Sequence, residues 1–198
     1  MHQGYAPHYV KGPGTIGNII YIRPVGAVDP GILQWLRQEM SESLWATVRV
    51  MPSIPVPPAS FEPARNQYIS TKILKEMLKE VPENALKLLG VTDKDLCIPI
   101  LTYVFGEAQL GGTTAVVSLA RLRQEYYGAP PDQKLFQERM RKECLHELGH
   151  TFGLIHCTSK ECVMYLSNTV VDVDTKGRTF CRACQMTVAS KTGAGKEE

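Results

Sequence analysis

A short stretch of the chain carries three histidines and a glutamate at metal-binding spacing: residues 146–156 read HELGHTFGLIH. Residues four apart lie on one face of a helix, so His146 and His150 can bind one metal ion. Glu147 is one step round the helix, where a base could take a proton from a water molecule. Gly153 lets the helix end and the chain turn, so that His156 can supply a third ligand. Three ligands and one open position are typical of hydrolytic zinc.

A pair of histidines four residues apart is often surface chemistry without a metal. The addition of Glu147, Gly153 and His156 at these offsets favours a catalytic zinc site over that alternative.

Cysteines follow the histidines directly. Four of the six cysteines have the spacing C-x4-C-x18-C-x2-C, namely Cys157, Cys162, Cys181 and Cys184. Two thiolate pairs separated by a loop are typical of a closed, structural zinc site. Two disulfides are the alternative, and they would need an oxidising compartment. We therefore expect two zinc ions per chain, one catalytic and one structural.

The long histidine motif resembles the zinc signature of the metzincin clan. The run His156-Cys157-x4-Cys162-x-Met164, followed by Cys181-x-x-Cys184, resembles the archaemetzincin family specifically. The resemblance implies a zinc metallopeptidase with Glu147 as general base and with Met164 in a methionine turn beneath the metal. Some clan members have an extra tyrosine ligand two residues after that methionine. Leu166 stands there in this chain, so we assign Tyr165 no catalytic role.

The resemblance also implies an α+β fold, with a twisted mixed β-sheet, an active-site helix, and a small C-terminal subdomain stabilised by the four-cysteine zinc site. We expect an N-terminal subdomain over residues 1–153, a C-terminal subdomain over 154–189 and a disordered tail over 190–198. In this clan an edge strand binds the substrate peptide antiparallel to itself. We expect Thr113–Leu119 to be that strand, with Ala115 and Val117 offering backbone groups, although Gly111-Gly112 could also mark a plain hairpin turn.

Upstream, the apolar pattern predicts alternating strands and helices. Asp29-Pro30 is expected to begin one helix and Asp132 to cap the helix that carries the zinc motif. Leu96–Phe105 is apolar on both faces, which predicts a central strand. Gly90 is expected to close a short helical turn. The remaining expectations are strands at Ile16–Ile22 and Thr47–Met51, a proline-rich loop at Met51–Pro63, and a helix from Ile73 to Val81.

The composition is that of an ordinary globular protein, with 198 residues, 43% hydrophobic residues and a net charge of +2. Because basic and acidic residues are nearly equal in number, the charge indicates neither nucleic acid nor a membrane as partner. We expect a monomer that acts on peptides or proteins. The first residues contain no apolar stretch typical of a secretion signal, which predicts a cytoplasmic protein. Cys97 and Cys144 are expected to be buried hydrophobes.

Two other function classes fit the same motifs. One is a regulatory protein that retains the zinc architecture without turnover, or a latent enzyme whose cleft is covered by Met51–Pro63 or by the first fourteen residues. The other is a zinc hydrolase that acts on a non-peptide amide. The presence of Glu147 argues against a chain that has lost catalysis.

Overall fold

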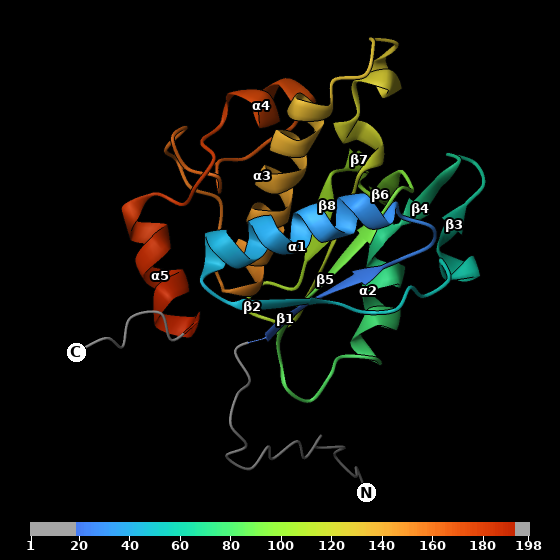
Figure 1. Cartoon of the computed structure of the whole chain (residues 1–198). Helices are drawn as coiled ribbons and strands as arrows, with labels where there is room; N and C mark the ends of the chain where they lie inside the picture. Colours follow the sequence, from blue (N-terminus) through green and yellow to red (C-terminus); the bar gives the residue numbers. More distant parts are fainter. Residues whose placement is uncertain (1–18, 193–198) are drawn as a thin grey trace, which may run out of the picture.

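The computed structural model describes residues 19–192, which form a mixed five-stranded sheet with helices on both faces (Figure 1). The strand order is β2-β1-β5-β9-β8. Only β8 is antiparallel to its neighbour, so the expected mixed sheet is confirmed. The strands are β1 (Ile19–Pro24), β2 (Thr47–Val50), β5 (Ala85–Thr92), β8 (Gly106–Ala108) and β9 (Thr114–Ser118).

Two long helices, α1 (Pro30–Leu44) and α3 (Gln133–Thr151), cover one face of this sheet, and α2 (Ser70–Leu78) covers the other. Successive residues of a strand face opposite sides. On β5, Leu89 therefore joins the core beneath α1 and α3, whereas Leu88 packs with α2.

Gly90 lies in β5, so the predicted helical turn is wrong at this place. A Cβ atom on Gly90 would lie 2.5 Å from the sulfur of Met77 on α2. The glycine thus allows α2 to pack closely on the central strand.

A second sheet has the order β3-β4-β6-β7. It consists of β3 (Phe61–Glu62), β4 (Gln67–Ile69), β6 (Leu96–Ile98) and β7 (Leu101–Val104). The prediction of one central strand over Leu96–Phe105 is therefore wrong. Pro99 has no N–H to donate, the chain reverses there, and Ile100 at the turn is 86% exposed. The proline-rich segment 51–63 is largely irregular, as expected, and includes a short 3-10 helix, η1 (Pro58–Ser60).

The expected edge strand is also corrected. β9 pairs with β5 on one side and β8 on the other, and all of its residues are buried. Ala115 and Val117 therefore have no free strand edge. The hydroxyl groups of this strand are bonded internally: Thr114 donates to Gln109 Oε1 over 2.9 Å, and Ser118 donates to the Lys94 carbonyl over 2.6 Å. The edge strand next to β9 is β8, and β2 forms the opposite edge.

Both predicted helix caps are confirmed. Asp29 accepts hydrogen bonds from the N–H groups of Gly31 and Ile32, and Asp132 accepts one from Leu135 over 2.9 Å. These caps fix where α1 and α3 begin. Two 3-10 helices, η2 (Ala120–Leu122) and η3 (Gln124–Tyr127), lead into α3.

The C-terminal part consists of loops, α4 (Val170–Thr175) and α5 (Arg182–Thr192). Helix α5 continues past residue 190 and buries Thr192. The prediction of a disordered tail is therefore wrong for residues 190–192. Residues 193–198, and residues 16–18 of the first predicted strand, lie outside the described part.

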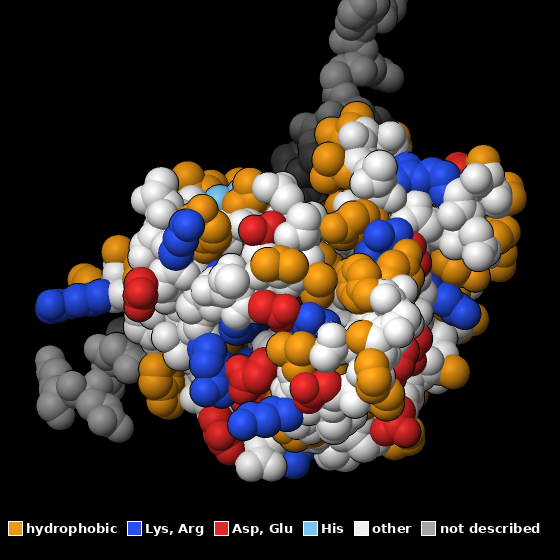
Figure 2. All heavy atoms as spheres, turned by 90° about the horizontal axis from the view of Figure 1, so that it is seen from above, with side chains coloured by type: hydrophobic (Ala, Val, Ile, Leu, Met, Phe, Trp, Pro, Cys, Tyr) orange, Lys and Arg blue, Asp and Glu red, His pale blue; other side chains and the backbone are white. Residues whose placement is uncertain are grey.

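Within residues 19–192, no helix combines the length and apolarity that crossing a bilayer requires. On the face shown in Figure 2, basic and acidic side chains of the described residues are interspersed. This face therefore carries no extended region of one charge.

Candidate active site

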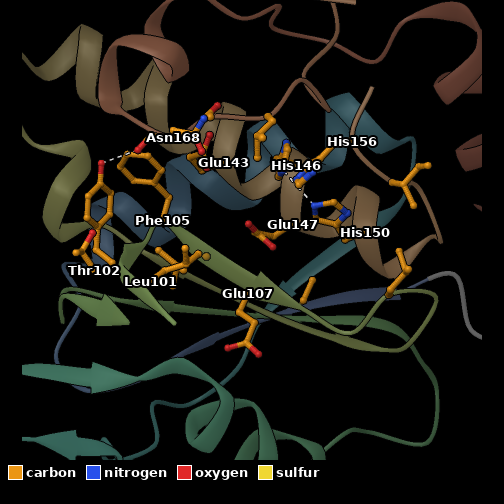
Figure 3. A pocket seen from close by; sticks show the side chains of 18 residues that line it. Leu101, Thr102, Phe105, Glu107, Glu143, His146, Glu147, His150, His156 and Asn168 are labelled. Carbon is orange, nitrogen blue, oxygen red and sulfur yellow. Dashed lines mark hydrogen bonds between the residues drawn. The ribbon is translucent and has the colours of Figure 1, made fainter. Parts of the chain in front are cut away.

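The three histidines of the motif meet at one point. His146 and His150 project from adjacent turns of α3, and His156 returns from the loop beyond the helix (Figure 3). One ring nitrogen of each lies within 4.8 Å of the others, and the two Nε2 atoms of His146 and His150 are 3.1 Å apart. Nitrogens bound tetrahedrally to one zinc ion would be separated by about 3.3 Å. The donor set therefore fits a zinc ion.

Backbone carbonyls orient two of the imidazoles. Nδ1 of His146 is 2.9 Å from the carbonyl oxygen of Val163, and Nδ1 of His150 is 2.7 Å from that of Leu154. A carbonyl only accepts, so each Nδ1 carries the hydrogen and each Nε2 keeps its lone pair for a metal. Burial, reinforced by the Lys176 charge, lowers the pKa of His146 well below its usual value. Burial also lowers the pKa of His150 and of His156. Neutral imidazoles are the ligand form.

Glu147 lies beside the three histidines and is 6% exposed. Burial, followed by the negative charge of Glu143, raises the pKa of its carboxyl group well above the usual value. Strand β8 runs directly against it: a Cβ atom on Gly106 would lie 2.5 Å from Cγ of Glu147. The glycine therefore brings the free edge of the sheet next to the glutamate.

A buried ion pair lies behind the histidines. Lys176 Nζ is 2.7 Å from Oε1 of Glu143 and 3.3 Å from Nδ1 of His146, and both charged side chains are almost fully buried. The sequence analysis missed this pair. Glu143 could have been found, because it lies one helical turn before His146; Lys176 is thirty residues further along the chain and carries no local signal.

The four predicted cysteines also converge. Their sulfurs lie within 4.8 Å of one another, with 4.0 Å between those of Cys157 and Cys181, and all are free. Thiolates on one tetrahedral zinc ion would be about 3.8 Å apart, whereas bonded sulfurs would be about 2.0 Å apart. The N–H of Cys184, at the start of α5, lowers the pKa of Cys181 to about 7. The spacing fits a metal. Cys97 and Cys144 lie elsewhere and are buried, as expected.

Met164 links the two clusters. It is fully buried, and a Cβ atom on Gly149 would overlap its sulfur, so the methionine lies against the helix between the two histidine ligands. Its carbonyl accepts a hydrogen bond of 2.9 Å from the N–H of Cys157. The loop that follows His156 is thus held to the segment containing Met164.

The C-terminal end of α3 is held by a lysine that the sequence analysis also missed. Lys87 Nζ on β5 donates to the carbonyls of Thr151 and Gly112, over 2.7 and 2.6 Å. Gly111 N–H in turn donates to the His150 carbonyl over 2.9 Å. These bonds fix the loop after β8 to the end of α3.

The histidines open into a cleft with a volume of about 640 Å³. One wall is the chain from Leu101 to Ala108, comprising β7 and β8, and the opposite wall includes α3 and residues 166–168. Predicted ligands and base thus face one cavity, while Ala115 and Val117 do not line it.

Comparisons with known proteins agree with this geometry. The sequence model of peptidase family M54 matches residues 56–190. An archaemetzincin of Methanocaldococcus jannaschii is 42% identical over 83% of this chain and 89% of its own. The crystal structure of archaemetzincin from Archaeoglobus fulgidus, complexed with malonate, superposes with a TM-score of 0.75 at 39% identity, covering 85% of this chain and 99% of that one.

A crystal structure described as a zinc-dependent peptidase, from Methanocorpusculum labreanum, gives a TM-score of 0.77 at 31% identity, over 85% of this chain and 99% of that one. The chain therefore belongs to peptidase family M54, the archaemetzincins, a family of zinc metallopeptidases.

Proposed function

We propose that this protein hydrolyses peptide bonds at the cleft, with zinc held by His146, His150 and His156 and with Glu147 as general base. The observation that carries the proposal is the position of Glu147. Its carboxyl group is buried beside three convergent imidazoles, in a cleft that is bordered by a free strand edge. A zinc ion there would polarise the scissile carbonyl and lower the pKa of a bound water.

In this reaction Glu147 accepts a proton from the attacking water and later passes a proton to the leaving amine. The pKa of its carboxyl group is raised. This suits both steps, because a group whose pKa lies nearer to the working pH can both take up and release a proton. The carbonyls of Val163 and Leu154 hold the ring orientation of two ligands throughout. Met164 supports the helix from below.

Strand β8 is the proposed peptide-binding edge. The bonds from Ser118 N–H to the Phe105 carbonyl and from Gln109 N–H to the Thr114 carbonyl show that odd-numbered residues of β8 and its flanks pair with β9. Since an antiparallel ladder alternates, the backbone groups of Gly106 and Ala108 point to the other side. A substrate strand could add there, antiparallel to β8.

We further propose a structural zinc ion on Cys157, Cys162, Cys181 and Cys184, which gives two zinc ions per chain. In this account residues 154–189 form a C-terminal subdomain that the metal stabilises in place of a core of its own. Reduced thiolates fit a cytoplasmic enzyme. We expect it to act as a monomer.

The test compares zinc-loaded wild type with its Glu147→Ala variant on a diverse peptide library, with products read by mass spectrometry. Loss of the general base should lower cleavage by at least about 100-fold, while both zinc ions stay bound because Glu147 is not a ligand. Products that persist at equal yield in the variant would refute the role of Glu147. Products from neither protein would favour a latent or non-catalytic chain. Residues 51–63 do not line the cleft, and the first fourteen residues lie outside the described part.

A further inference from the structure

The cleft contains a second carboxylate, which the proposed reaction does not use. Glu143 lines the cleft although it is only 2% exposed. Its Oε1 has no hydrogen-bond partner among residues 19–192. The approach of Lys176 Nζ, at 2.7 Å, is an ion pair without hydrogen-bond geometry. A carboxylate can accept several hydrogen bonds, so Glu143, which lines the cleft, keeps acceptor capacity beside its ion pair with Lys176.

Apolar side chains line the same cleft. Phe105 and Leu101 come from the strand wall, and Leu166 comes from the opposite wall. The hydroxyl of Tyr103 donates to the carbonyl of Asn168 over 2.7 Å, which joins the two walls at this end of the cleft (Figure 3). This half of the cleft is therefore a pocket with apolar sides, a closed end and an acidic group.

The direction of the substrate decides which of its residues enters this pocket. A peptide antiparallel to β8 runs from Ala108 towards Phe105 and Tyr103, so its C-terminal half lies beside Phe105. Glu143 is on the same side, since it lies one turn of α3 before His146, whereas His150 lies towards the other end. The side chain that directly follows the scissile bond thus faces Glu143.

We propose that this pocket selects lysine or arginine after the scissile bond, an inference that rests on the proposed function. The apolar walls suit the methylene stem of such a side chain, and its cationic N–H groups can donate to Glu143. An aliphatic side chain would displace water from Glu143 and supply no donor in exchange. An acidic side chain would be repelled.

The test uses zinc-loaded wild type and three peptides that differ only in the residue after the scissile bond: lysine, norleucine or glutamate. Norleucine keeps the stem of lysine without the amine. We expect kcat/KM to be at least about tenfold higher for lysine than for norleucine, equivalent to about 1.4 kcal/mol, and lowest for glutamate. Cleavage of the norleucine peptide at an equal or higher rate would overturn the proposal.

Two variants on α3 identify the responsible group. Glu143→Gln should bring the lysine-to-norleucine ratio close to one. Glu138→Gln, a control that removes a half-buried carboxylate paired with Arg178, should leave the ratio unchanged. Because Glu143→Gln leaves Lys176 without its counter-ion and could unfold the protein, the double variant Glu143→Gln/Lys176→Met is measured as well. A wild-type ratio in either folded Glu143 variant would refute the assignment.

Binding separates this inference from the proposed function. The same peptides are titrated calorimetrically into zinc-loaded Glu147→Gln protein, which should bind without turnover. Tighter binding of the lysine peptide, together with no hydrolysis by wild type, would refute peptidase activity and support the pocket. Equal binding of the lysine and norleucine peptides would refute the pocket, whatever the wild type hydrolyses.

Discussion

The two ligand clusters of this protein differ in how the chain builds them. The histidine cluster takes two ligands from one rigid helix, α3, and opens into a cleft. The cysteine cluster takes all four sulfurs from loops and the start of α5, in a part of the chain that has only short helices. The difference fits the two proposed roles: the open cluster would hold a catalytic zinc ion facing the substrate, and the closed cluster would hold a structural zinc ion.

The clusters are joined through adjacent residues. His156 is the third histidine and Cys157 the first cysteine. His156 is exposed, and it lies beyond the end of α3. Its position therefore depends on the loop that Cys157 anchors to Met164.

The largest expected effect comes from breaking the closed cluster. Cys184→Ser removes one ligand of a metal whose binding contributes on the order of 10 kcal/mol to folding. We expect the melting temperature to fall by more than about 10 °C, since about 1 kcal/mol corresponds to 2–4 °C in a chain of this size. Catalytic zinc affinity should fall as well, because His156 loses its anchor. Calorimetry and zinc titration measure both effects. Cys97→Ser, at a cysteine outside the cluster, is the control for catalytic zinc affinity, which it should leave unchanged.

A smaller effect is expected where Met164 meets the helix. Gly149→Ala would place a methyl group on the Met164 sulfur, and such overpacking costs about 1–3 kcal/mol. The variant should unfold at a lower denaturant concentration and bind catalytic zinc more weakly. In a Met164→Ala background, the Gly149→Ala change should cost less stability than it does in wild type, because the overlap is gone. If the stability losses of the two changes simply added, close packing of Met164 on Gly149 would be excluded as the cause of the loss in Gly149→Ala.

The smallest expected effect is the loss of stability that acidification causes through the histidine cluster. The pKa of His146 is lowered in the folded state, mainly by burial, while unfolded histidine has a pKa of about 6.5. Above that pH both states are neutral and the histidine contributes nothing. Below it only the unfolded chain takes up the proton, so protein stripped of catalytic zinc should lose stability as the pH falls, by at most about 1.4 kcal/mol per histidine and pH unit.

Melting temperatures of wild type and His146→Gln between pH 8 and 5.5 check this prediction. The variant should show the shallower decline below about pH 6.5. Identical slopes would mean that His146 does not titrate on unfolding.

The site was more predictable from sequence than the sheet. The histidine and cysteine spacings encode local geometry, so residues that the motif grouped are also grouped in space. Strand order depends on distant contacts. The edge strand β8 is only three residues long and begins with Gly106, which gives it no hydrophobic pattern, while β9 looked half-polar because Thr114 and Ser118 bond inside the protein. Lys176 and Glu143 meet only through folding, so no local pattern could predict their ion pair.

Stepwise zinc removal tests most directly whether the two clusters differ as proposed. Protein purified without chelator is treated with increasing concentrations of a mild chelator, and bound zinc, peptide cleavage and melting temperature are measured at each step. We predict two zinc ions at the start. The first should leave the open three-ligand site and abolish cleavage with little change in melting temperature, and the second should leave only as the fold loosens. Loss of both ions in one step, or a starting content of one, would contradict the account.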